Sequence, residues 1–358
     1  MGTGAGQCKN TGGVAVNRAA GLVYVADAGN DRVNVFDENG DFKSSIGAPG
    51  SGAGQFTNPR RIAIDNDSTS PNFEDVYVTD ASLRVQRFNA GGVFEATIGA
   101  GTLKTSNPPI SVIPGGDLYV ADGAGSGSPE PRQIKIFDPA GALTGSSTLS
   151  VDSAREATTD STGITYVNSF SGGEKTLKYE PTEPTATLLS VFDALSNTSA
   201  LAVDEDDNLY SAQIIGGFRL ITKRDPSGTI VKRFGYGEIP FESIQGLSVG
   251  ASGDLFATRS FFNETEGDNI VRVPQPAPGP LPCCLIATPG NTKTTLKGHV
   301  NPENATTTYH FEYLTEADFI ANGNSFSGPN QPISTPVSPP VGPDFDINAV
   351  EAKIGCAN

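Results

Sequence analysis

The chain has 358 residues and a formal net charge of −16, because 40 Asp and Glu outnumber 24 Lys and Arg. This charge argues against partners that need clustered basic residues, namely nucleic acids and anionic membrane surfaces. The 42 Gly and 26 Pro in a chain that is 37% hydrophobic favour many short strands with tight turns. We expect no membrane insertion, since no apolar run is long enough, and the first residues lack a signal-peptide pattern.

A repeat of short apolar runs is the strongest signal in the sequence. Its most regular run occurs as VYVAD (23–27), VYVTD (76–80), LYVAD (118–122), ITYVN (164–168), LYSAQ (209–213) and LFATR (255–259). Another short apolar run precedes each copy, as in GVAVN (13–17), and a third run follows, as in RVNVFD (32–37). A weaker fourth run closes several units. Apolar alternation broken by Gly, Asn and Pro predicts four antiparallel strands per unit, and six units predict an all-β six-bladed propeller.

Short motifs around the first two units carry a family resemblance. GAGQ occurs at 4–7 and again ending at Gln55, and the first copy leads into VYVADAGNDRVNVFDENGDF (23–42). These residues resemble the NHL repeat family in its bacterial secreted type. The resemblance implies a six-bladed propeller, for which we expect residues 1–273. Some NHL propellers bind RNA on a basic face, and the acidic charge of this chain counts against that role.

The C-terminal region differs in pattern from the repeat. A stretch with five prolines in nine positions predicts a stiff linker at 274–283. The sequence CLIATPGNTKTTLKGHVNPENATTTYHFEYL (284–314) resembles the opening half of a fibronectin type III-like domain. We therefore expect a small, partial β-sandwich-like domain over 284–358.

Residues at the ends of the VYVAD-type runs, the second run of each unit, are the candidates for a ligand site. Equivalent strands end on one face of a propeller, so these residues form a candidate ring at the axial mouth: Asp27, Asp80, Asp122, Asn168, Gln213 and Arg259. The predicted six-bladed propeller resembles those of lactonase-like proteins, which hold a divalent ion with Glu, Asn and Asp at such positions. Gln213 and Arg259 depart from that pattern, because an arginine competes with a cation. We expect Arg32 and Arg84 to have a structural role, pairing with the Asp that ends the preceding run.

Two acidic turns and the scarcity of histidine bear on metal binding. DENGD (37–41) and DEDDN (204–208) make Asp37, Asn39, Asp41, Asp204 and Asp206 weak candidates for a calcium site, although solvated hairpin turns have the same pattern. Both histidines, His299 and His310, lie in the C-terminal region, which argues against a histidine-bound catalytic metal in the propeller. We predict no catalytic residue and no cofactor, with calcium left open.

The four cysteines are Cys8, Cys283, Cys284 and Cys356. Their spacing does not fit a structural zinc site, and disulfide bonding is the expectation, although the neighbours Cys283 and Cys284 would pair only with strain. Buried thiols are the alternative.

Three functions fit these patterns. The first is a secreted or cell-surface, non-enzymatic module that binds protein or carbohydrate, with the long loops 66–75 and 123–132 as contact candidates. The second is a metal-dependent, lactonase-like hydrolase with an axial divalent ion. The third is a self-assembling protein, because the sixth repeat lacks a fourth run and a neighbouring copy could donate that strand.

Overall fold

A computed structural model of the chain describes residues 2–123, 132–148, 154–169, 176–182, 185–192, 198–215, 218–234, 244–259, 269–273, 281–288, 293–301, 312–313, 333–334, 337 and 348–355. Cys356, His310 and most of the loop 123–132 lie outside these residues. Contacts divide the chain into two compact units, Met1–Thr229 with Phe241–Gln275 and Ile230–Pro240 with Pro276–Asn358. Among the described residues, no helix is long and apolar enough to cross a bilayer.

The first half of the propeller consists of three four-stranded antiparallel sheets. Blade 1 contains β1 (Thr11–Asn17), β2 (Leu22–Asp27), β3 (Arg32–Asp37) and β4 (Phe42–Ile46). Blade 2 contains β7 (Arg61–Ile64), β8 (Val76–Asp80), β9 (Arg84–Phe88) and β10 (Phe94–Ile98). Blade 3 contains β11 (Ile110–Val112), β12 (Leu118–Asp122), β13 (Gln133–Phe137) and β14 (Leu143–Thr148). A short helix η1 (Ala28–Asn30) and the parallel pair β5 (Ala48–Pro49) and β6 (Gln55–Phe56) lie in connections.

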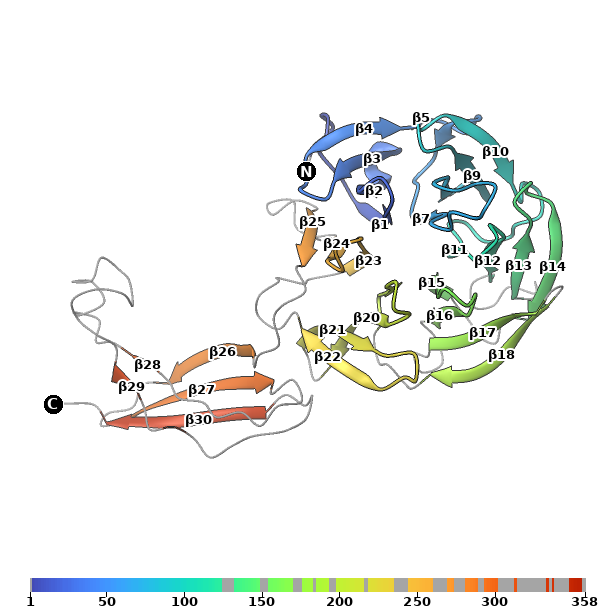
Figure 1. The fold of residues 1–358 in the computed structure, drawn as a ribbon. Helices are drawn as coiled ribbons and strands as arrows, with labels where there is room; N and C mark the ends of the chain where they lie inside the picture. Colours follow the sequence, from blue (N-terminus) through green and yellow to red (C-terminus); the bar gives the residue numbers. More distant parts are fainter. Residues whose placement is uncertain are drawn as a thin grey trace. The chain divides into compact units, whose positions relative to one another are not determined.

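The second half completes a ring of six blades, as Figure 1 shows. Blade 4 contains β15 (Ala154–Thr159), β16 (Thr165–Ser169), β17 (Thr176–Thr182) and β18 (Thr185–Phe192). Blade 5 contains β19 (Ala200–Val203), β20 (Leu209–Ile215), β21 (Phe218–Arg224) and β22 (Ile230–Phe234). Blade 6 contains β23 (Ile244–Val249), β24 (Leu255–Arg259) and β25 (Asn269–Val273), its three strands among the described residues. The all-β six-bladed propeller that the repeat predicts is confirmed.

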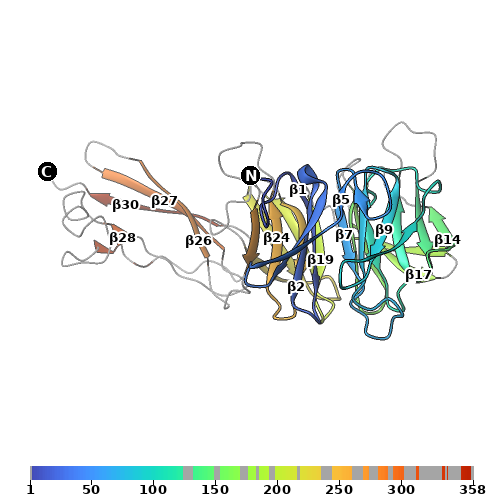
Figure 2. The same cartoon turned by 90° about the horizontal axis from the view of Figure 1, so that it is seen from above.

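Alternation within each strand explains why the blades pack side by side. In blade 1, Tyr24 and Val35 belong to a core cluster shared with blade 2. Val23 and Val25, their neighbours on the other face, cluster instead with Phe256 of blade 6. Successive strand residues point to opposite faces, so one blade fills two interfaces and is stable only within the ring. Figure 2 shows this ring edge-on.

A buried tyrosine recurs in the second strand of most blades. Tyr24, Tyr77, Tyr119, Tyr166 and Tyr210 are each at most 2% exposed. Two of them donate their hydroxyls to the aspartate of the preceding turn, Tyr166 to Asp160 at 3.3 Å and Tyr210 to Asp204 at 3.0 Å. Burial raises the pKa of Tyr210, and the nearby Asp204 carboxylate adds to that shift. The tyrosine of the VYVAD-type run therefore tethers the turn before it.

The first strand of each blade is the innermost one. Each of these six strands (β1, β7, β11, β15, β19 and β23) forms the edge of its own sheet and contacts the inner strands of the neighbouring blades. Blade 6 closes on blade 1 at a close backbone approach, where a Cβ on Gly246 would meet the Cα of Gly13 at 2.7 Å. The Thr258 hydroxyl donates to the Gly12 carbonyl at 2.5 Å nearby. Glycine at this contact lets the ring close.

Apart from β22, whose sheet is that of blade 5, the second unit contains one three-stranded antiparallel sheet in the order β26 (Leu281–Thr288), β27 (Lys293–Asn301) and β30 (Asn348–Gly355). A separate pair is formed by β28 (Glu312–Tyr313) and β29 (Ile333–Ser334). Strand β26 begins inside the stretch predicted as the linker, and it contains Cys283 and Cys284.

Candidate axial binding site

The predicted ring residues of the first two blades hold the connection between successive blades. Asp27 is fully buried, accepts the backbone N–H of Lys9 at 2.7 Å and pairs with Arg32 at 2.9 Å. Asp80 repeats this with Arg84 at 3.1 Å. These carboxylates therefore fix the loop that leads into the inner strand, in the structural role expected of Arg32 and Arg84.

The GAGQ motifs belong to the same arrangement. Arg32 donates to the carbonyls of Gly4 and Gln7, both at 2.7 Å, and Arg84 donates to that of Gln55 at 2.8 Å. Each glutamine also folds back on its own loop, since Gln7 Oε1 accepts the N–H of Gly4 at 3.0 Å. The GAGQ residues and the arginine therefore form a clamp that holds this loop in place. The clamp occurs in both blade 1 and blade 2.

The other four predicted ring residues are also engaged within the blades. Asp122 pairs with Lys135 at 2.5 Å. Asn168 donates to the Thr198 carbonyl at 2.9 Å, and Gln213 accepts the Thr222 hydroxyl at 2.8 Å. Arg259 is 7% exposed. None of the six is among the residues that line the cavity along the propeller axis.

The acidic turns bind their own backbone. Asp37 Oδ1 accepts the N–H groups of Asn39 and Asp41 at 2.9 and 3.0 Å, and its other oxygen pairs with Lys43 at 2.7 Å. Asp204 accepts the N–H of Asp206 at 3.1 Å and pairs with a lysine, Lys223, at 3.0 Å. Within the described part of the chain, no group of three or more His, Cys, Asp or Glu residues has a metal-binding arrangement.

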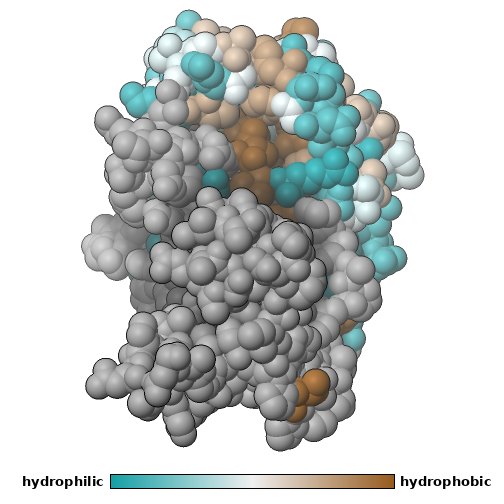
Figure 3. Space-filling view, turned by 90° about the vertical axis from the view of Figure 1, so that its left-hand side faces the viewer, coloured by the Kyte–Doolittle hydropathy of each residue, from teal (hydrophilic) through white to brown (hydrophobic). Residues whose placement is uncertain are grey.

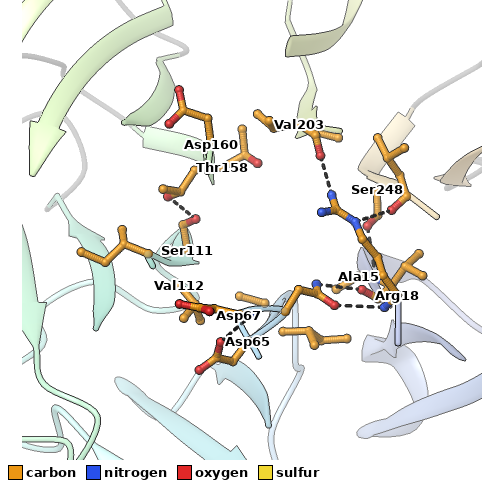
Figure 4. Close-up of a pocket in the computed structure, with 18 of the residues that line it drawn as sticks. Ala15, Arg18, Asp65, Asp67, Ser111, Val112, Thr158, Asp160, Val203 and Ser248 are labelled. Atoms are coloured by element: carbon orange, nitrogen blue, oxygen red, sulfur yellow. Dashed lines mark hydrogen bonds between the residues drawn. The ribbon is translucent and has the colours of Figure 1, made fainter. Parts of the chain in front are cut away.

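A cavity of about 650 Å³ lies along the propeller axis, and the inner strands of all six blades line it (Figure 4). Its walls combine aliphatic side chains such as Val112 with hydroxyls such as Ser111, Thr158 and Ser248. At the ends of the inner strands the cavity opens onto a mouth, here named the acidic mouth, lined by Asp65, Asp67, Asp160, Asp204 and Glu205.

Arg18 follows β1 at the acidic mouth and connects blades that are distant in sequence. Its guanidinium donates to the carbonyl of Val203 at 2.7 Å and to that of Val249 at 3.3 Å, so it joins blades 1, 5 and 6 (Figure 4). Burial lowers the pKa of Arg18, while the carboxylates of Glu205 and Asp204 oppose that shift. The guanidinium therefore lies near the acidic turn that contains Asp204 and Glu205.

An ion pair stands where the inner strands begin, at the other end of the cavity from the acidic mouth. Glu156 on β15 accepts from Arg61 on β7 at 2.9 Å, and the same Arg61 nitrogen donates to the Gln245 carbonyl at 3.3 Å. The two side chains are 13% and 17% exposed. Burial raises the pKa of Glu156, and the Arg61 charge counteracts that shift.

The oxygen atoms around the propeller axis are not arranged to bind a divalent ion. Glu156 is the one acidic residue within the six inner strands, and its carboxylate already binds a guanidinium. At the acidic mouth, Asp67 accepts the N–H groups of Thr69 and Gly115, and Asp160 accepts those of Thr162 and Ile164. A calcium site needs several carboxylate or carbonyl oxygens directed at one point, and these oxygens are directed at donors.

A second cavity of about 410 Å³ lies between blades 1 and 6 and is lined by Cys8, Val23, Phe36, Phe256 and Ile270, among others. In Figure 3, hydrophobic surface is exposed in a hollow, and hydrophilic residues lie along one side of it. Cys8 is buried and accepts from the Asn34 amide at 3.4 Å. The side chains of the other three cysteines lie outside the described ones, so no disulfide of Cys8 is shown.

Sequence reasoning missed the residues that line or close the axis, namely Arg18, Arg61 and Glu156. They lie in or directly after the first of the four runs in their units. One signal was available for Arg61, the one charged residue of the otherwise apolar strand β7, because a charge in such a strand is costly unless it is paired.

Comparisons with known proteins agree with the fold. A family described as 6-bladed beta-propeller matches residues 11–98, which span blades 1 and 2. The Drosophila melanogaster protein named brain tumor is 36% identical over 101 residues. That match covers 28% of this chain and 9% of the Drosophila protein, so the chain spans a small part of this relative.

Solved structures resemble the propeller at low identity. Regucalcin of Agrobacterium tumefaciens, described as a calcium-binding protein, has a TM-score of 0.54 and 13% identity, over 75% of this chain and 92% of its own. A putative gluconolactonase has a TM-score of 0.53 and 15% identity, over 76% of this chain and 93% of its own. At such identity the likeness concerns the fold alone.

Proposed function

We propose that the chain is an extracellular, non-enzymatic binding module that takes a group of a protein or carbohydrate partner into the axial cavity through the acidic mouth. The observation that supports this most strongly is the cavity itself, with Glu156, its one strand-borne carboxylate, already bound by Arg61. The cavity volume of about 650 Å³ falls in the usual range for ligand sites.

The lining favours a polar, uncharged or cationic group. Hydroxyls of Ser111, Thr158 and Ser248 offer both donors and acceptors, and Phe73 adds an aromatic face at the acidic mouth. The five acidic residues at this mouth outnumber Arg18, so an anionic group would meet repulsion. A carbohydrate without acidic groups, or a lysine-bearing or arginine-bearing protein segment, fits these features.

Loop 66–75 forms one wall of the acidic mouth, with Asn66, Asp67, Ser68 and Phe73 lining the cavity. Its backbone is ordered by its own side chains, because Asp67 and Ser70 accept N–H groups within the loop. A loop held in this way loses little conformational entropy on binding. This supports its role as the contact loop.

We assign the blades to the NHL type, on the clamp formed by GAGQ, Asp27 and Arg32, and the second unit to a partial fibronectin type III-like domain. Both types are consistent with a secreted or cell-surface location. The metal-dependent hydrolase is the weaker candidate, because the axial oxygens do not converge on one point.

A binding array tests the proposal. The full chain is applied to neutral, amino and acidic oligosaccharides and to basic and acidic peptides, beside two variants. Thr158→Trp fills the cavity, whereas Val93→Trp adds the same side chain at a position that is 59% exposed and outside the cavity. We expect binding of a neutral or basic probe that Thr158→Trp abolishes and Val93→Trp keeps. Equal binding by both variants would place the contact elsewhere.

Self-assembly is tested separately by light scattering over a range of concentrations. A mass that stays at one chain sinks the idea that a neighbouring copy donates the fourth strand of blade 6.

A further inference from the structure

Arg61 links every second blade of the propeller. It belongs to blade 2, its guanidinium pairs with Glu156 of blade 4 at 2.9 Å, and the same nitrogen donates to the Gln245 carbonyl of blade 6 at 3.3 Å. Each of these three blades is a separate sheet, and another blade lies between each of them and the next. One cation therefore bridges inner strands that do not pair with one another.

The charges of this link are well shielded from water. Glu156 and Arg61 are 13% and 17% exposed, and the Glu156 backbone N–H is held by the Asn168 side chain at 2.7 Å. A buried carboxylate without a counter-charge would be strongly disfavoured. Arg60, the neighbour of Arg61, adds positive charge, and burial lowers the pKa of Arg60.

The contacts of Arg61 resemble those that an ion on the propeller axis would make with the surrounding inner strands. A divalent ion at this position would draw oxygens from several inner strands toward one centre. Here a guanidinium draws one carboxylate and one carbonyl from two other blades, and a second arginine, Arg18, binds carbonyls of blades 5 and 6 at the acidic mouth.

We propose that Arg61 is a built-in axial cation, which fixes the ring through Glu156 and Gln245 in the place where a divalent ion would otherwise be held. The cation is part of the chain, so ring stability depends on this arginine and not on calcium. This inference concerns stability and metal response, whereas the proposed function concerns ligand binding in the cavity; the unfolding cycle tests the first and the binding array tests the second.

A double-mutant cycle measures the coupling. The full chains are wild type, Arg61→Ala, Glu156→Ala and the double variant, with thermal unfolding followed by tyrosine near-ultraviolet CD, because most tyrosines lie in the propeller. Each single variant should lower the midpoint by roughly 5 °C or more, and the double variant by much less than the sum. Additive losses would overturn the proposal. If Arg61→Ala does not fold, Arg61→Gln and Glu156→Gln form a cycle of the same kind.

Chemical rescue distinguishes an axial cation from an ordinary ion pair at the surface of a blade. Ethylguanidinium at low millimolar concentration should raise the midpoint of Arg61→Ala more than that of wild type, and should leave the double variant unchanged. Calcium and chelator should leave the wild-type midpoint unchanged. A calcium-dependent rise in wild type that Glu156→Ala removes would show that the site holds a metal ion and would refute the proposal.

Discussion

Lys135 Nζ lies 2.5 Å from Oδ2 of Asp122, and it reaches that carboxylate from the third position of β13. In blades 1 and 2 the partner is an arginine at the first position of the third strand, Arg32 or Arg84. The third position faces the same side of the strand as the first, so a long lysine replaces the arginine after the insertion in blade 3. Blade 3 therefore keeps the ion pair, although the arginine at the first position of the third strand is absent.

Removing this lysine should destabilise the propeller. Lys135 and Asp122 are 9% and 1% exposed, so Lys135→Met leaves a buried carboxylate uncompensated, at a cost of about 3–5 kcal/mol in the free energy of unfolding. Urea titration measures the loss. Lys43→Met, which breaks an exposed pair with Asp37, is the matched control and should have a small effect. Similar losses in both variants would contradict the account.

Asp75 should make stability fall as the pH rises. Burial raises its pKa to about 6, and Arg87 opposes that shift. The folded state binds more protons than the unfolded state between about pH 4 and 6, so the free energy of unfolding decreases across this window. After allowance for solvent screening, the decrease due to Asp75 is about 1–2 kcal/mol. Asp75→Asn should remove it in urea titrations at several pH values.

Asp67, on the same loop, serves as a control of opposite sign. The N–H groups of Gly115 and Thr69 lower its pKa, so it stabilises the fold above its unfolded pKa, and that stability is lost as the pH falls through the folded value. Asp67→Asn should therefore lose stability at neutral pH. A wild-type pH slope that Asp75→Asn leaves unchanged would count against the assignment.

Gly246→Ala should weaken the closure of the ring. The added methyl would lie 2.7 Å from both the Cα of Gly13 and the backbone nitrogen of Val14, so blades 6 and 1 must move apart. We expect a loss of roughly 1–3 kcal/mol, measured by urea unfolding. Gly91→Ala is the control, because its methyl meets one side-chain oxygen of Asn89 at 3.3 Å in a turn. A neutral Gly246→Ala would mean that the contact does not limit closure.

The fold was accessible from the sequence because each blade repeats the same local pattern. The predicted run VYVAD (23–27) falls within β2, and RIAID (61–65) overlaps β7 to within one residue. Alternation and turn residues are local signals, so periodicity alone located these strands.

The axial residues were not accessible in the same way. Arg61 and Glu156 are 95 positions apart and lie in different blades, and only ring closure brings them together. The predicted ring failed to reach the cavity for a related reason, since Asp27 and its equivalents end the second strands while the first strands line the axis. Strand order within the blade, which repeats do not reveal by themselves, decides which residues face a ligand.

One measurement tests the central claim, that the axis serves binding and not metal-dependent catalysis. The full chain and Glu156→Gln are dialysed against calcium and zinc, their metal content is determined by elemental analysis, and both are assayed on a panel of lactones. We predict less than stoichiometric metal in either protein and no turnover above background. One ion per wild-type chain, lost in Glu156→Gln together with lactone hydrolysis, would contradict the account.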